Sequence, residues 1–205
     1  MKRTIRDILL VILFCGYSVL PTYGQDGLQS IYDHIMSGQL TNAERELDTF
    51  EQESNPNDTM QIDIFYLRGL MLEQKGDNDS AMSYYSECCN RAEATDFKDV
   101  TYLDALMRIM LLQFHNEDFE GCANTGMRAL KTPTEVLELY PASSHLFSVL
   151  ATAMSHLRKF AEVPKIAQKG EPYIHRHFTP KDESYYEFAN VRSHCLFDDG
   201  ENRKG

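Results

Sequence analysis

The sequence predicts an all-α protein, built as an α-solenoid of helix-turn-helix hairpins with about four and a half repeated units. Three observations lead to this prediction. Apolar residues recur at spacings of three and four, which is the period of an amphipathic helix. A turn followed by a small residue recurs along the chain at nearly constant spacing. No stretch alternates polar and apolar residues as a half-buried strand would.

The first 24 residues have the pattern of an export signal. Three basic residues precede an apolar run at 8–20, which Pro21 ends, and small residues at positions 22 and 24 suit cleavage before Gln25. The run is shorter than the roughly 20 apolar residues that span a bilayer. Cys15 lies inside the run and fits a lipidation site poorly. We expect residues 1–24 to be a signal peptide and the mature protein to be exported, either periplasmic or extracellular. An uncleaved membrane anchor is the alternative.

Residues 25–205 are expected to form one repeat domain, and the clearest unit spans residues 65–89. Its first apolar stripe ends at the turn Gly76-Asp77, and a second stripe runs through Ala81, Tyr85 and Cys88. Glycine is the residue that most readily ends a helix, because it adopts a left-handed backbone conformation without steric cost. The unit therefore reads as two helices joined by a tight turn.

The same pattern recurs along the rest of the chain. Its turns start at positions 38, 76, 117 and 158, which gives spacings of 38, 41 and 41 residues, and one further step of 41 reaches the turn at 198–200. Five places after each turn start stands a small residue. Two helices of a hairpin approach closely there and leave no room for a large side chain. These residues are Ala43, Ala81, Cys122 and Val163.

The unit at 65–89 resembles a tetratricopeptide repeat. The six positions that carry the resemblance are filled by Phe65, Gly69, Gly76, Asp77, Ala81 and Tyr85. The resemblance extends over about residues 27–199 in degenerate form. Met110 and Ala151 stand where later units would carry the first glycine, and the period exceeds the 34 residues usual for the family.

The resemblance implies that the first helices of successive hairpins line a concave groove that binds a peptide or a protein. Large side chains on such a face would anchor the partner. The expected groove residues are Tyr66, Leu70, Glu73, Met107, Leu111, Phe114, Ser148, Thr152 and Ser155, with His115 and His156 at the edge.

The charge of the chain excludes two classes of partner. The net charge is −11, and because residues 1–24 carry three basic residues and one acidic residue, the remainder has a net charge of −13. Such a chain repels the phosphates of nucleic acids and anionic membrane surfaces. We therefore expect neither nucleic-acid binding nor membrane insertion after the signal is removed.

No catalytic or metal-binding motif stands out, so we expect no enzyme activity, no cofactor and no metal. His175-Arg-His177 lies near Pro172 and Pro180 and reads as an exposed connector. Cys195 falls on an apolar stripe, where packing is the usual role. A hydrolase that uses Cys195 or the histidines at 175–177 is kept as a minor alternative. The four cysteines after the signal allow three disulfide pairings, although burial in helices is favoured. They are Cys88, Cys89, Cys122 and Cys195.

The leading functional hypothesis is an exported scaffold that binds a peptide or protein partner. The alternative is an N-terminal sensing or scaffold segment of a larger regulatory or peptidase system, with its effector truncated or separately encoded. A fifth unit starts at 185–197, but its second helix is missing. The helix at 185–197 would then be a cap, a surface for self-association, or the start of further repeats.

Overall fold

The computed structural model describes residues 26–54 and 57–177, and every regular element in these ranges is a helix. The all-α prediction is therefore confirmed for this part of the chain. The predicted signal peptide, Cys195 and the incomplete fifth unit lie outside the described residues. The helices, in chain order, are α2 (Asp26–Met36), α3 (Leu40–Ser54), α4 (Asp58–Gln74), α5 (Asn78–Ala94), α6 (Val100–His115), α7 (Phe119–Ala129), α8 (Thr134–Leu139), α9 (Ser143–His156) and α10 (Val163–His177).

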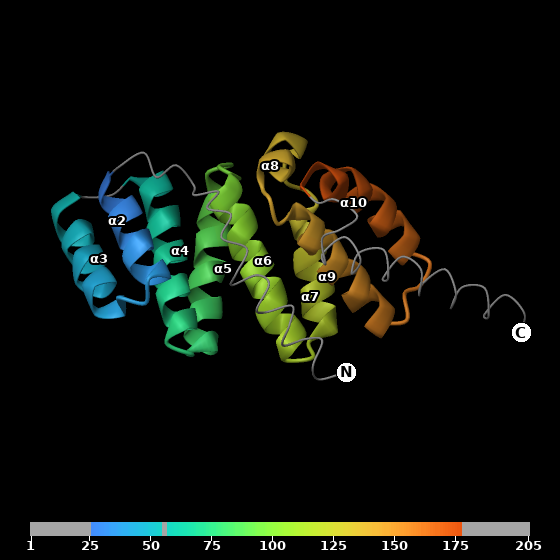
Figure 1. Cartoon of the computed structure of the whole chain (residues 1–205), viewed down its shortest axis with the longest axis horizontal. Coiled ribbons are helices and arrows are strands. Elements are labelled where there is room, and N and C mark those ends of the chain that lie inside the picture. The colour runs from blue at the N-terminus through green and yellow to red at the C-terminus, as the bar shows by residue number, and fades with distance from the viewer. Residues whose placement is uncertain (1–25, 55–56, 178–205) are drawn as a thin grey trace, which may run out of the picture.

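The longer helices form four hairpins that stand side by side in a row (Figure 1). The hairpins are α2 with α3, α4 with α5, α6 with α7, and α9 with α10. Short α8 lies between the third and the fourth hairpin. Together with the long α4 and α5, of 17 residues each, it contributes to the spacing of 38 to 41 residues between successive turns.

The chain reverses at each of the four positions that the repeat spacing predicted. The φ angles there are 76° at Gly38, 81° at Gly76, 60° at Glu117 and 57° at Arg158. All four lie in the left-handed region, which glycine adopts freely and which strains other residues. The third and fourth turns thus keep the backbone geometry of the first two without the residue that favours it.

The small residues after the turns are fully buried, which explains why they are small. Each has no exposed surface, and they are Ala43, Ala81, Cys122 and Val163. Gly69 has a comparable role in the second hairpin. A Cβ atom there would lie 2.5 Å from Cε1 of Tyr85, so only glycine lets the two helices approach as closely as they do.

The first helices of the hairpins also pack on one another. α2 contacts α4, α4 contacts α6, and α6 contacts α9, while α5 packs on α6 and α7 packs on α9. We call the side formed by α2, α4, α6 and α9 the first-helix face. Among the described helices, no comparable packing joins α3, α5, α7 and α10 to each other.

Aspartate side chains start three of the helices. Asp77, Asp99 and Asp118 each accept a hydrogen bond from a backbone N–H in the first turn of α5, α6 and α7. A cap of this kind satisfies an N–H group that has no partner within the helix. No described helix is both long and apolar enough to span a bilayer.

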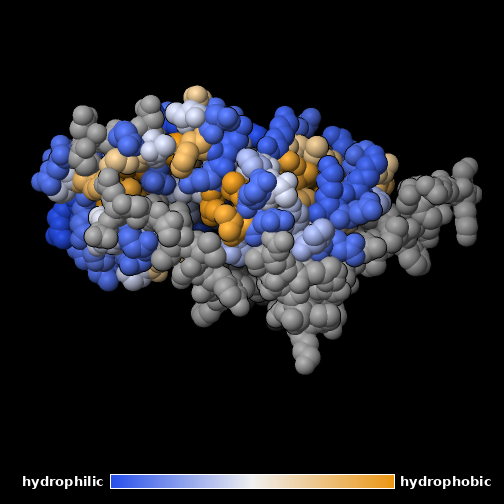
Figure 2. All heavy atoms as spheres, turned by 90° about the horizontal axis from the view of Figure 1, so that it is seen from above, coloured by the Kyte–Doolittle hydropathy of each residue, from blue (hydrophilic) through white to orange (hydrophobic). Residues whose placement is uncertain are grey.

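One apolar core runs through the row. On the face that Figure 2 shows, the described surface is mostly hydrophilic with separate apolar patches. Tyr85, Tyr102 and Phe147 are among the largest fully buried side chains. The large apolar side chains that the described part of the chain exposes are Met36, Phe97, Met127 and Leu139.

Candidate functional site

The most connected polar group on the first-helix face is a set of six residues, which we call the tyrosine–carboxylate cluster. It brings together residues of α4, α5 and α6 and the residue that follows α8. The members are Tyr66, Glu73, Tyr85, Asp104, Arg108 and Tyr140.

Asp104 is the centre of the cluster. Its Oδ2 accepts hydrogen bonds from the Tyr66 hydroxyl at 2.5 Å and from Arg108 Nε at 2.8 Å. Its Oδ1 accepts from the Tyr140 hydroxyl at 2.5 Å. One carboxylate thus joins side chains from α4, from α6 and from the segment that leads into α9.

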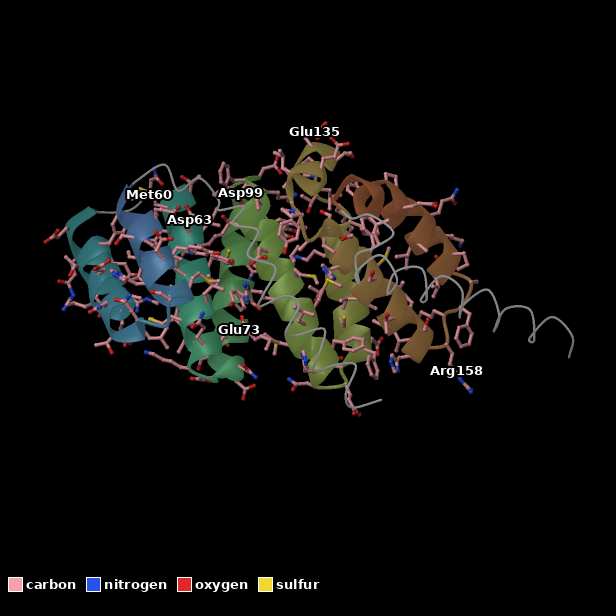
Figure 3. All side chains as sticks on the ribbon, in the orientation of Figure 1. Met60, Asp63, Glu73, Asp99, Glu135 and Arg158 are labelled. Carbon is pink, nitrogen blue, oxygen red and sulfur yellow. The ribbon has the colours of Figure 1, made fainter. Side chains whose placement is uncertain are left out.

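Arg108 connects this centre to a second carboxylate. Its Nη1 donates to Glu73 Oε2 at 3.1 Å, and the same oxygen accepts from the Tyr85 hydroxyl at 2.5 Å. Figure 3 labels Glu73 on the half of α4 that leads into the α4–α5 turn. One guanidinium therefore bridges two carboxylates on neighbouring hairpins.

The spacing of the residues explains why they meet. Asp104 and Arg108 lie four apart on α6, so they share one helix face and form an ion pair. Tyr66 and Glu73 lie seven apart on α4, which places them on one face two turns apart. The packing of α4 on α6 then brings the two faces together.

Burial differs within the cluster. The tyrosine rings lie in the core, and Tyr66, Tyr85 and Tyr140 are at most 5% exposed. The charged side chains reach the surface: those of Asp104, Arg108 and Glu73 are 22%, 23% and 28% exposed. The hydroxyls of buried tyrosine rings therefore donate hydrogen bonds to carboxylates that stay partly exposed.

The electrostatics keep Asp104 ionised. Burial raises the pKa of Asp104, but the charge of Arg108 and the hydroxyls of Tyr140 and Tyr66 outweigh that effect, so its pKa is lower than usual. Burial, and the neighbouring carboxylates, raise the pKa values of Tyr85 and Tyr140 well above that of a free tyrosine. Both tyrosines thus remain hydrogen-bond donors at any physiological pH.

The structure buries three of the residues that we expected to line the groove. Tyr66, Leu70 and Met107 are 3%, 2% and 3% exposed. Leu111 is partly buried against the core. Only Tyr66 among these four joins the polar cluster, through its hydroxyl.

The expected residues at the C-terminal end of α6 form an aromatic group with α7 and α9. The ring of Phe114 meets those of Phe119 and His156 edge-on, with centroids 5.3 Å and 5.8 Å away, and His156 stacks on Phe119 at 4.0 Å. His115 is exposed, and its Nδ1 lies 2.6 Å from the carbonyl oxygen of Leu111. This group is separate from the tyrosine–carboxylate cluster.

The expected residues on α9 turn their hydroxyls back to their own helix. Ser148, Thr152 and Ser155 each donate to the backbone carbonyl oxygen four residues earlier. Such bonds are internal to the helix.

Sequence reasoning missed four of the six cluster residues: Tyr85, Asp104, Arg108 and Tyr140. A signal for two of them was present, because Asp104 and Arg108 interrupt the otherwise apolar stretch 102–112 at a spacing of four. Charges at such a position need partners when the helix is buried. Tyr140 gave no signal, since its place depends on how α8 folds.

A second polar group lies near the N-terminal ends of α4 and α6. The Thr101 hydroxyl donates to Asp63 Oδ1 at 3.2 Å, and Asp99 caps α6 nearby. Figure 3 labels Asp63 and Asp99 at this end. Burial and the charge of Asp99 raise the pKa of Asp63 to about 7.

The described thiols are neither paired nor exposed. Cys88, Cys89 and Cys122 are free and buried, and burial raises the pKa of Cys122 to about 12. Within residues 26–54 and 57–177, no group of three His, Cys, Asp or Glu side chains could hold a metal ion. The side chains of His175 and His177 lie outside the described set.

No family model matches the chain, and no curated protein matches it either. The resemblance to tetratricopeptide repeats thus remains a prediction from the sequence.

Proposed function

We propose that the protein is an exported interaction scaffold, a solenoid of tetratricopeptide-like hairpins that binds a peptide or protein partner through its first-helix face. The observation that carries the proposal is the tyrosine–carboxylate cluster. It holds three charged side chains on the face where successive hairpins align, and buried tyrosine hydroxyls fix two of them.

The regularity of the hairpins supports the solenoid part of the proposal. The four turns share one backbone geometry, and each is followed by a fully buried small residue. The first helices pack on each other in chain order. These are features of an array in which each unit buries apolar surface against the next.

Preorganisation supports the binding part. The Arg108 guanidinium donates to both carboxylates. The carboxylates also accept from hydroxyls whose rings are packed in the core. A partner that meets charges already held in place loses less conformational entropy on binding. The proposal includes no chemical step, and buried thiols of raised pKa suit packing rather than nucleophilic attack.

Site-specific photo-crosslinking tests the proposal. A photoreactive amino acid is placed at Gln74 or His115, exposed ends of α4 and α6, and at Ser83 or Asn124, exposed positions on α5 and α7, as matched controls. In the exported protein, we expect one partner to crosslink from Gln74 and His115 and not from the controls. Crosslinks confined to Ser83 and Asn124 would contradict the proposal, and so would the absence of crosslinks from Gln74 and His115.

A further inference from the structure

We infer that the partner of the first-helix face presents a lysine or arginine side chain to the carboxylates of Glu73 and Asp104. The inference rests on the proposed function and adds the chemistry of the partner. It is carried by the charge of the cluster, by an open acceptor on Glu73 and by the burial of the apolar residues around them.

The cluster has an excess of negative charge. Two carboxylates, those of Glu73 and Asp104, share the single guanidinium of Arg108. Along α2, α4, α6 and α9 the only other Lys or Arg is Arg68, whose Nη2 pairs with Asp48 and Glu51 of α3 at 2.7 Å and 2.6 Å. These four helices therefore provide no second Lys or Arg to neutralise the remaining negative charge of Glu73 and Asp104.

Glu73 also has an oxygen available to a new donor. Its bonds from Arg108 and Tyr85 both end on Oε2, and among the described residues no donor reaches Oε1. The side chain is 28% exposed. Asp104 has both oxygens engaged, so it contributes charge to an incoming cation while Glu73 accepts its hydrogen bond.

Other chemistries fit this face less well. An incoming carboxylate would approach Arg108 past two carboxylates that already neutralise it. A large apolar anchor would find Leu70 and Met107 buried, at 2% and 3% exposure, with little surface to cover. The net charge of −11 adds a long-range attraction for basic partners.

Binding of defined peptides to the full exported protein tests the inference. The probes are rhodamine-labelled hexalysine and hexaglutamate, and binding is followed by fluorescence anisotropy at low and moderate salt. We expect hexalysine to bind and hexaglutamate not to bind. Glu73→Gln should weaken hexalysine about tenfold, since it removes a charge-assisted hydrogen bond. Glu87→Gln, on α5 with 43% side-chain exposure, removes the same charge elsewhere and should change binding by less than about twofold.

A second measurement on the unmodified protein does not depend on the folding of a variant. Carbodiimide activates a carboxyl group as an O-acylisourea. The amine of an adjacent bound lysine, after it loses a proton, displaces the urea and forms an amide, and peptide mapping then identifies the coupled residue. We expect coupling of hexalysine at Glu73. Coupling spread evenly over the acidic surface would overturn the inference, and so would tighter binding of hexaglutamate or equal losses in Glu73→Gln and Glu87→Gln.

The two proposals fail in different ways. If a partner crosslinks from Gln74 and His115 while hexalysine does not bind, the cationic partner is wrong and the scaffold stands. If crosslinks arise only from Ser83 and Asn124, the first-helix face is not the binding surface.

Discussion

Replacing Asp104 by alanine removes the acceptor of three hydrogen bonds at once. The Tyr66 and Tyr140 hydroxyls would both lose their carboxylate partner, and their residues are only 3% and 5% exposed. A buried polar group left without its partner costs about 1–3 kcal/mol. Arg108 would keep its bond to Glu73. We therefore expect Asp104→Ala to lower the free energy of unfolding by about 2–6 kcal/mol in total.

A double-mutant cycle isolates the interaction from general effects of the substitution. Tyr140→Phe alone should cost about 1.5–3 kcal/mol, because it removes a hydrogen bond to a charged group. In the Asp104→Ala protein the same substitution should cost close to nothing, since that hydroxyl is already without its acceptor. The coupling should thus exceed about 1 kcal/mol.

Urea unfolding followed by circular dichroism at 222 nm measures these differences, provided that the slope of free energy against urea stays constant among the variants. The reasoning would be refuted if Asp104→Ala cost less than about 1 kcal/mol, a value ordinary for an arbitrary substitution. A coupling near zero between Asp104 and Tyr140 would refute it as well.

Three further substitutions test the turns, the helix packing and the buried carboxyl. Glu117→Gly should raise the melting temperature, because it relieves a positive φ of 60°, a strain of roughly 1 kcal/mol. Gly69→Ala should destabilise by about 1–3 kcal/mol in urea, because its Cβ would meet the fully buried Tyr85 ring, whereas Gly27→Ala, with 3.4 Å to its nearest neighbour, should not. Since the pKa of Asp63 is about 7 when folded, against about 4 when unfolded, stability from this group falls as pH rises from 4 to 7. Asp63→Asn should therefore flatten the change in urea midpoint between pH 5 and pH 8.

Each of these expectations has a contrary outcome. A lower melting temperature for Glu117→Gly would mean that the side chain contributes more than its strain costs. Equal effects at Gly69 and Gly27 would show that helix packing tolerates a methyl group. If the urea midpoint of Asp63→Asn changed with pH as that of the parent does, titration of groups other than Asp63 would be the cause.

The helices and turns were predictable from local pattern, whereas the polar cluster was not. Positions 38, 76, 117 and 158 could be found because turn chemistry repeats along the chain, even where Glu117 and Arg158 replace glycine. The residues of the cluster meet only after α4, α6 and the segment behind α8 have packed. A single sequence does not contain the pairing of Tyr140 with Asp104, because 36 positions separate them.

The expected groove residues also show that local pattern does not predict tertiary packing. Position on the first helices was enough to select Tyr66, Leu70 and Met107, but not to decide which way each side chain points. In long helices that pack on both neighbours, more of the circumference is covered, so apolar residues at groove positions are drawn into the core. Glu73 stays partly exposed because its charge resists that burial.

The bonds at Asp104 have a mechanical consequence. In a row of hairpins that contact one another only along their sides, neighbouring hairpins can rotate relative to one another, which changes the curvature of the row. Here one carboxylate ties together Tyr66 in the second hairpin, α6 in the third and Tyr140 at the entry to the fourth. Any change of curvature between α4 and α9 must stretch or break one of these ties. These hydrogen bonds therefore oppose bending between the second hairpin and the segment that leads into α9.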